Sequence, residues 1–168
     1  DRTDYDLGVH MEHSKQDLRY LDPETNEKYL PFVIEPSLGL DRAILAFLCN
    51  AYTKEILANG EEREVLKIHP ALAPVKATIL PLIKKNHKDK AMEIYSLVCS
   101  HFQASYDESG SIGKRYRRSD AIGTPFAITV DDETLTDNIV TIRDRDTMEQ
   151  IKLPIDELVN YIEEKISF

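Results

Sequence analysis

Apolar residues in the first third of the chain follow two different spacings. Residues 28–35 (KYLPFVIE) are rich in aromatic and β-branched side chains and predict a strand, with the internal proline favouring an edge position or a bulge. From Leu40 to Tyr52, apolar residues recur every three or four positions, which predicts a helix with one buried stripe. Asn59 and Gly60 are typical of a helix C-terminus. The predicted order is therefore strand, short turn and long helix.

The rest of the chain alternates predicted strands and helices. Strands are expected at residues 65–68, 75–82, 104–106, 126–130, 138–144 and 147–153, and helices at 88–102 and 154–166. A βαβ order followed by a late hairpin predicts an α/β domain with a mixed β-sheet flanked by helices. The change of pattern near residue 61 predicts two domains, 1–61 and 62–168.

Composition limits the class of protein. The 168 residues include 30 acidic and 21 basic side chains, for a net charge of −9, and 42% are hydrophobic, as in an ordinary globular chain. No apolar run reaches the ~20 residues that cross a bilayer, so we expect a cytoplasmic protein without a membrane partner. Cys49 and Cys99 lie in apolar helical patterns, which favours core packing in a reducing compartment over a disulfide. The chain starts without Met inside a polar pattern, so we expect it to be cut from a longer protein.

The segment EPSLGLDR, residues 35–42, places charged groups around the predicted turn. Glu35 ends the strand, and Arg42 lies in the first turn of the helix, where unpaired N–H groups and a guanidinium suit phosphates. Glu35 would meet a positively charged group such as an amine. The pattern therefore fits a ligand with an ammonium group at one end and phosphates at the other. The alternative is a surface ion pair between Glu35 and Arg42.

A second candidate site is the basic stretch GSIGKRYRR, residues 110–118. This stretch is basic although the chain as a whole is acidic, and it places an aromatic ring among four cations. The cations could bind RNA phosphates, and the ring could stack on an unpaired base. The candidate residues are Lys114, Arg115, Tyr116, Arg117 and Arg118. The alternative is a solvated turn and helix whose arginines pair with Asp107, Glu108 and Asp120.

Other polar clusters predict no chemistry. His10 and His13 have no second ligand pair at a matching distance, so no metal site is expected. The alternating charges of residues 141–147 predict a salt-bridged turn, and the lysines of residues 84–90 predict the solvated start of a helix.

The sequence also resembles a known family. Residues 29–48 (YLPFVIEPSLGLDRAILAFL) look like the third signature motif of class II aminoacyl-tRNA synthetases. Together with RTDYDL, LKIHPALAPVKATILPL, GSIGKRYRRSDAIGTPFAITVDDETL and VTIRDRDTMEQ, they make the whole chain similar to the C-terminal part of dimeric (eukaryotic-like or bacterial α2) class II glycyl-tRNA synthetases. The resemblance implies an anticodon-binding domain with a mixed sheet, preceded by the last strand and helix of the antiparallel catalytic domain.

The resemblance also implies residue roles. Arg42 would be the catalytic arginine on ATP phosphate, with Gly39, Leu40 and Asp41 lining the nucleotide. The glycine substrate would be bound by the segment before the helix, with Glu35 on its ammonium group; its residues are Glu35, Pro36, Ser37, Leu38 and Gly39. Lys114–Arg118 would contact the anticodon region of tRNA(Gly).

The parent enzyme implied by the resemblance is a homodimer that ligates glycine to tRNA(Gly), using ATP with Mg²⁺, through glycyl-adenylate. The first two signature motifs are absent from these 168 residues. We therefore expect no aminoacylation by this piece alone and no tightly bound cofactor. The alternative is a non-catalytic RNA- or protein-binding module that reuses the anticodon-binding fold.

Overall fold

The computed structural model describes residues 1–167, which form two compact units. The first unit is Asp1–Ala43, and the second contains the chain from Ile44 onward.

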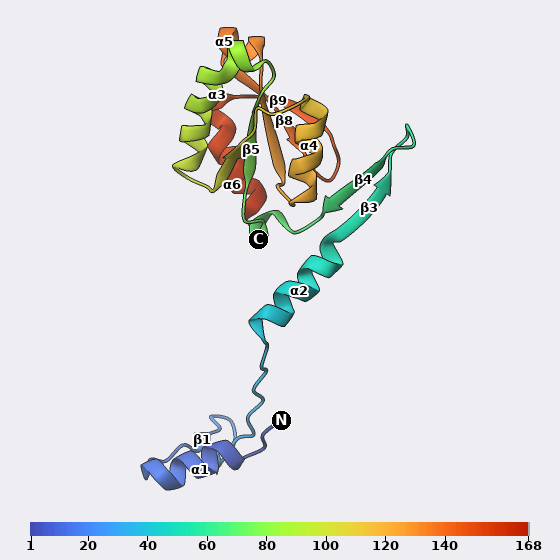
Figure 1. Ribbon diagram of the computed structural model, residues 1–168. Helices are drawn as coiled ribbons and strands as arrows, with labels where there is room; N and C mark the ends of the chain where they lie inside the picture. The colour runs from blue at the N-terminus through green and yellow to red at the C-terminus, as the bar shows by residue number, and fades with distance from the viewer. Residues whose placement is uncertain (168) are drawn as a thin grey trace. The chain divides into compact units, whose positions relative to one another are not determined.

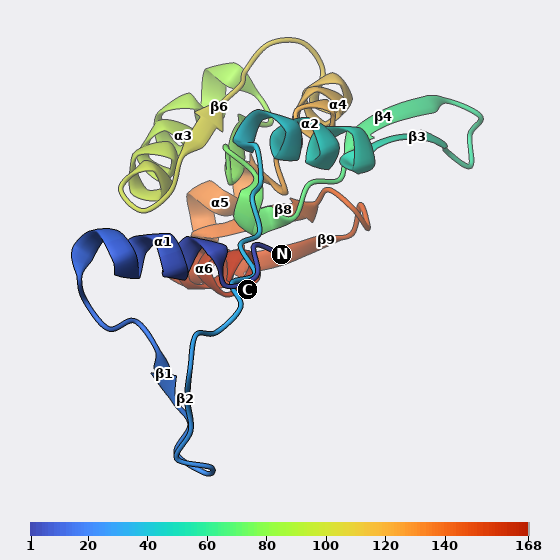
Figure 2. The same ribbon diagram turned by 90° about the horizontal axis from the view of Figure 1, so that it is seen from below.

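The first unit contains one helix and a short ribbon (Figure 2). Helix α1 spans Tyr5–Ser14, and the two-residue strands β1 (Tyr20–Leu21) and β2 (Lys28–Tyr29) pair antiparallel. The strand predicted at 28–35 is thus only partly formed. Beyond the proline at position 31, which has no N–H to donate, the chain pairs elsewhere: Val33 exchanges two backbone hydrogen bonds of 2.9 Å with Arg2 and Thr3.

Helix α2 (Leu40–Ala51) begins where the apolar spacing predicts, but it ends earlier than the sequence suggested. The chain passes directly into β3 (Tyr52–Ile56), which pairs antiparallel with β4 (Glu62–Leu66) in a separate two-stranded sheet. Gly60, with φ +82°, lies in the connecting turn rather than at a helix end. The expected domain boundary at residues 61 and 62 therefore falls inside this hairpin.

Five strands form the mixed sheet of the second unit, in the order β6-β5-β7-β8-β9 (Figure 1). The strands are β5 (Ala77–Pro81), β6 (Ala104–Tyr106), β7 (Phe126–Val130), β8 (Ile139–Asp144) and β9 (Gln150–Pro154). Strands β6, β5 and β7 are parallel, whereas β8 and β9 add as an antiparallel hairpin. The predicted α/β architecture is confirmed.

Helices cover both faces of this sheet. The α-helices are α3 (Lys84–Cys99), α4 (Ile112–Ala121), α5 (Asp132–Asp137) and α6 (Leu158–Ile166), and 3₁₀ turns occur at Pro70–Leu72 and Ile155–Glu157. Figure 1 shows α3 and α6 on one face and α4 on the other. Because successive strand residues point to opposite faces, Ile79, Ile128 and Ile142 join the core under α3 and α6, whereas Thr129 faces α4.

A buried ion network lies on the α4 face of the sheet. Asp120 of α4, 1% exposed, accepts hydrogen bonds from Arg63 Nε (2.9 Å) on β4 and from Arg143 Nη1 (2.9 Å) on β8. Arg63 also donates to Glu55 Oε2 (2.7 Å) on β3 and to the carbonyl of Arg145. The network thus joins the hairpin β3–β4 to the helix and to the main sheet.

Gly123 supports the same region from the end of α4. Its φ is +82°, and a Cβ there would lie 3.1 Å from Ile68 Cγ2, Leu66 Cδ2 and the Leu66 carbonyl oxygen. We expect Gly123→Ala to lower the free energy of unfolding by about 2–4 kcal/mol, from backbone strain plus overpacking. Gly60→Ala is the matched control, because Gly60 has the same φ and no neighbour within 4 Å of its Cβ position. It should cost about 1 kcal/mol in the same urea titration; equal losses would contradict the packing argument.

The two cysteines are not part of the core. Cys49 and Cys99 are free thiols, and both are exposed, so their assignment to the core was wrong. Among the described residues, no helix has the length and apolar character needed to cross a membrane.

Candidate functional site

The basic stretch predicted to bind RNA forms most of helix α4, and the helix divides its side chains between two faces. Counted from the half-buried Ile112, a period of 3.6 residues places Arg115, Tyr116, Ser119 and Asp120 on the same face. The structure buries three of these four and half-buries Tyr116. Lys114, Arg117 and Arg118 occupy the other face.

Arg115 and Tyr116 act within the fold. The Arg115 guanidinium, 5% exposed, donates to the Pro81 carbonyl (2.6 Å) and to the Gly110 carbonyl (3.0 and 3.2 Å). The Tyr116 hydroxyl lies 2.7 Å from Thr129 Oγ1, and Arg143 lies over its ring at 4.9 Å. An RNA contact by the Arg115 guanidinium or a base stacked on Tyr116 does not fit these positions.

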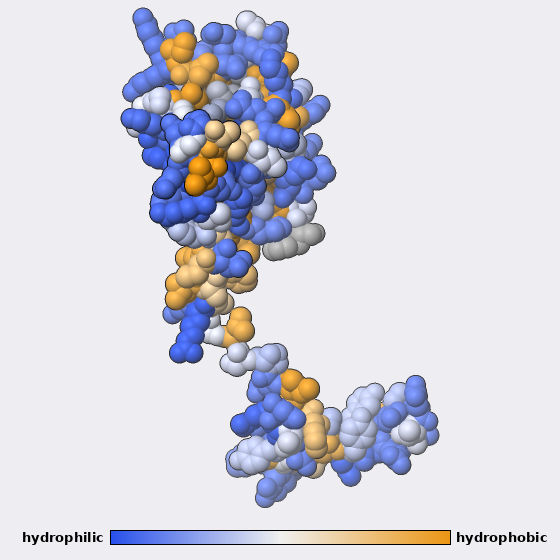
Figure 3. All heavy atoms as spheres, turned by 90° about the vertical axis from the view of Figure 1, so that its right-hand side faces the viewer, coloured by the Kyte–Doolittle hydropathy of each residue, from blue (hydrophilic) through white to orange (hydrophobic). Residues whose placement is uncertain are grey.

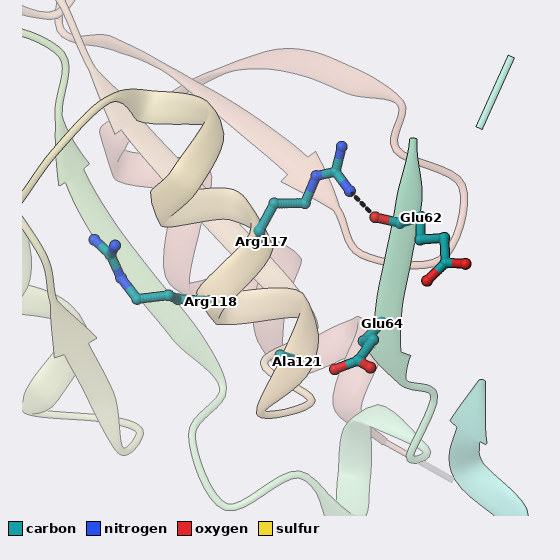
Figure 4. A pocket seen from close by; sticks show the side chains of 5 residues that line it. All are labelled: Glu62, Glu64, Arg117, Arg118 and Ala121. Carbon is teal, nitrogen blue, oxygen red and sulfur yellow. Dashed lines mark hydrogen bonds between the residues drawn. The ribbon is translucent and has the colours of Figure 1, made fainter. Parts of the chain in front are cut away.

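The three outward cations of α4 point in different directions. Arg117 points toward β4, where it donates to the Glu62 carbonyl (2.9 Å) and to Glu61 Oε2 (2.8 Å) (Figure 4). Arg118 lies on the opposite side of the helix and donates to Asp107 Oδ2 and to the Ser109 carbonyl. Lys114 is exposed and forms no ion pair within residues 1–167.

A pocket of about 410 Å³ lies beside Arg117, between α4 and β4. It is lined by Glu62, Glu64, Arg117, Arg118 and Ala121. Two of these residues are glutamates of β4 and two are arginines of α4, of which only Arg117 points toward β4, so the charge of the pocket is mixed rather than basic. The alternative of acid-paired arginines is therefore partly realised: Arg118 pairs with Asp107, but Asp120 and Glu108 pair with other residues.

A second basic run also approaches the loop before α4. It consists of the lysines of residues 84–90, which the sequence predicted to be the solvated start of a helix. Lys84 of α3 forms an ion pair with Glu108, which lies in the loop before α4, and Lys88 adds a favourable charge interaction. Lys85 and Lys88 are exposed and, like Lys114, have no ion-pair partner among the described residues. The first turns of α3 and α4 both follow the carboxyl ends of parallel strands, where α/β sheets commonly bind ligands. We call this region, formed by residues 84–88 and 107–118, the basic edge.

The predicted aminoacyl-nucleotide segment lies in the first unit and is largely exposed. Glu35 and Ser37 line a pocket of about 660 Å³ with Arg2, Asp6 and His10, among others. Arg2 forms two 2.8 Å hydrogen bonds to the Asp6 carboxylate, which lower the pKa of Asp6. The sequence reasoning missed Arg2 and Asp6 because nothing in the spacing brings the N-terminus to Glu35.

Arg42 lies in the first turn of α2, as predicted. It is exposed, and no ion pair between Glu35 and Arg42 forms in the described part of the chain. Gly39 approaches the Arg42 side chain, with 4.0 Å between its Cβ position and Arg42 Cδ. The N-terminal turn of α2 and an uncommitted guanidinium could therefore hold a phosphate together.

Metal binding has no support from side-chain clustering. Within residues 1–167, no group of three His, Cys, Asp or Glu side chains is placed to hold an ion.

Comparison with protein families gives a match over the second unit. Residues 73–165, more than half of the chain, match the model described as an anticodon binding domain. Among solved structures, the chain is similar to the RNA binding domain of threonyl-tRNA synthetase from Cryptosporidium parvum, with a TM-score of 0.55 and 26% sequence identity. That likeness covers 59% of this chain and 25% of the other.

Sequence relatives match the chain from end to end. It is 65% identical over 168 residues to a glycine–tRNA ligase of Clostridium tetani, 61% over 166 residues to one of Clostridium acetobutylicum, and 59% over 167 residues to one of Geobacillus thermodenitrificans. The matched region covers 99–100% of this chain but 36% of each relative. The chain therefore spans about a third of the length of these relatives.

Proposed function

Because the chain belongs to the anticodon-binding domain family, we propose that it supplies tRNA(Gly) recognition to a glycine–tRNA ligase. The observation that carries the proposal is the basic edge. Three lysines that form no ion pair in the described chain, Lys85, Lys88 and Lys114, come from two helices that begin at the carboxyl ends of the parallel strands. Cations so placed neutralise RNA phosphates, and the net negative charge elsewhere disfavours indiscriminate binding.

The outward residues of α4 remain the proposed tRNA contacts. Lys114 has no ion pair to break, whereas Arg117 and Arg118 would replace some of their present hydrogen bonds by hydrogen bonds to phosphate. Arg115 and Tyr116 support this surface from beneath, by fixing α4 against β5 and β7. Their role in tRNA binding is positional.

We further propose that the whole ligase joins glycine to tRNA(Gly) with ATP through glycyl-adenylate, as a cytoplasmic homodimer. Arg42 would contact ATP phosphate, with Gly39, Leu40 and Asp41 beside the nucleotide. Glu35 would bind the ammonium group of glycine, within the segment from Pro36 to Gly39. The exposure of Glu35 and Arg42 in the described chain supports these roles.

Residues 1–168 alone should not aminoacylate. An adenylate-forming transition state needs groups fixed around the phosphate from several elements, whereas the groups proposed here for the nucleotide all come from the first turn of α2 and the residue before it.

RNA binding at the basic edge can be tested by salt dependence. Lys88→Gln with Lys114→Gln should weaken binding of the chain to the anticodon arm of tRNA(Gly) several-fold. The slope of log K against log salt should fall in magnitude by about 1.4, because each lost phosphate contact contributes about 0.7. The charge-matched control is Lys54→Gln with Lys165→Gln, on the hairpin and on α6. Equal slopes for the two double variants would refute phosphate contact at this edge.

A further inference from the structure

Glu108 is an acidic side chain set into the basic edge. Its Oε1 pairs with Lys84 Nζ, and its Oε2 accepts a 2.8 Å hydrogen bond from the Tyr106 hydroxyl. The side chain is 23% exposed. Each carboxylate oxygen thus has one fixed partner, and the group keeps its orientation while still facing solvent.

The neighbours of Glu108 also fix its charge. Lys84, then the Tyr106 hydroxyl, lowers the pKa of Glu108, so the group is a carboxylate at neutral pH. Burial, followed by the bond to Glu108, raises the pKa of Tyr106 to about 12, so the phenol keeps the proton that it donates. A carboxylate has about four acceptor positions, and two are occupied here.

The adjacent acid, Asp107, has less free capacity to accept a further hydrogen bond. Its Oδ2 accepts from Arg118 Nε (2.9 Å) and Nη2 (2.5 Å), and its Oδ1 accepts from the Ser109 backbone N–H (2.9 Å). Glu108 is therefore the acid of this loop with acceptor capacity to spare.

A free acceptor among cations discriminates between parts of an RNA. It repels a phosphate, whereas a carboxylate pairs well with the exocyclic amino group of a base, as glutamate does with cytosine N4. Uracil presents a carbonyl oxygen in place of that amino group, so it meets repulsion. A loop with unstacked bases, bound by its phosphates to the neighbouring lysines, would bring such an edge to Glu108.

We propose that Glu108 is a specificity-determining residue that reads an amino-bearing base of the bound RNA. The proposal rests on the proposed tRNA-binding function. Because glycine codons begin with two guanines, the anticodons of tRNA(Gly) carry two cytosines, and Glu108 accepts a hydrogen bond from N4 of one of them.

The test compares anticodon arms in which each anticodon cytosine is replaced in turn by uracil. The unmodified chain should bind the arm with one of these replacements about tenfold or more weakly. Glu108→Gln should bind the cytosine arm more weakly and lose most of the discrimination at that one position, without weaker binding of the uracil arm. The matched control is Glu93→Gln on α3, an exposed glutamate paired with Lys90, which should keep full discrimination.

A second variant separates base reading from the ion pair. Lys84→Met removes the partner of Glu108 but leaves the carboxylate and the Tyr106 hydrogen bond, so discrimination should persist. If the chain binds the arm but Glu108→Gln weakens cytosine and uracil arms equally, the inference fails and the proposed function stands. If the unmodified chain does not bind the arm at all, both fail.

Discussion

Replacing Asp120 with alanine should lower the free energy of unfolding of the second unit by about 3–5 kcal/mol. The change leaves two buried arginines, Arg63 and Arg143, without the carboxylate that now bonds to both. Losing one partner of a buried ion pair is far more costly than losing a surface pair, because the remaining charge stays desolvated. Thermal and urea unfolding followed by circular dichroism would measure the loss.

The control for Asp120→Ala is Glu61→Ala. Glu61 also pairs with an arginine, Arg117, but its side chain is 64% exposed. An exposed pair contributes about 0–1 kcal/mol, so this variant should unfold close to the unmodified chain. Similar losses for the two variants would show that the buried network does not stabilise the unit as described.

Replacing Arg42 with alanine in a full-length glycine–tRNA ligase carrying this sequence should slow ATP–pyrophosphate exchange by about 10²–10³. The proposed reason is that the Arg42 guanidinium stabilises the charge that develops on the transferring phosphates. Water that takes the place of the guanidinium in the variant stabilises that charge poorly. The loss should appear in kcat as well as in kcat/KM, since an interaction made mainly in the transition state affects both.

Arg19→Ala provides the control for Arg42. Arg19 is an exposed arginine of the same unit, and Asp17 already binds it through two hydrogen bonds. Exchange should be unchanged in that variant. Near-normal exchange by Arg42→Ala would remove Arg42 from the nucleotide site while leaving the RNA-binding proposal untouched.

Much of the fold could be predicted from local patterns. Strands β6 and β7 begin and end where the sequence suggested; β7 is a run of mainly β-branched and aromatic residues that follows a turn signal of glycine and proline. The hairpin β3–β4 was missed because residues 52–56 continue the apolar helical spacing of α2. Only pairing with residues 62–66, which local spacing does not reveal, favours the strand.

The candidate sites, too, could be predicted from the sequence only in part. The first turn of α2 and the basic charge of α4 were both visible in the sequence, but the burial of Arg115 was not deduced from composition. The signal was present in the spacing, since Arg115 and Asp120 follow Ile112 by three and eight residues. The partners of Asp120 lie 57 and 23 residues away along the chain, beyond the reach of any local pattern.

Helix α2 leaves large apolar side chains uncovered, which Figure 3 shows as orange spheres along this segment. Leu45 and Phe47 are 61% and 56% exposed. Their exposure agrees with a chain that spans about a third of its relatives, since helices of this kind ordinarily pack against other elements.

The buried network also sets an order of assembly. An isolated two-stranded ribbon is at best marginally stable in water, and Arg63 finds its partners 57 and 82 residues downstream. The strands β3 and β4 therefore become locked only after α4 and the end of β8 are in place. As the chain leaves the ribosome, the β3–β4 ribbon therefore waits for a much later segment before its amides are protected from exchange with solvent.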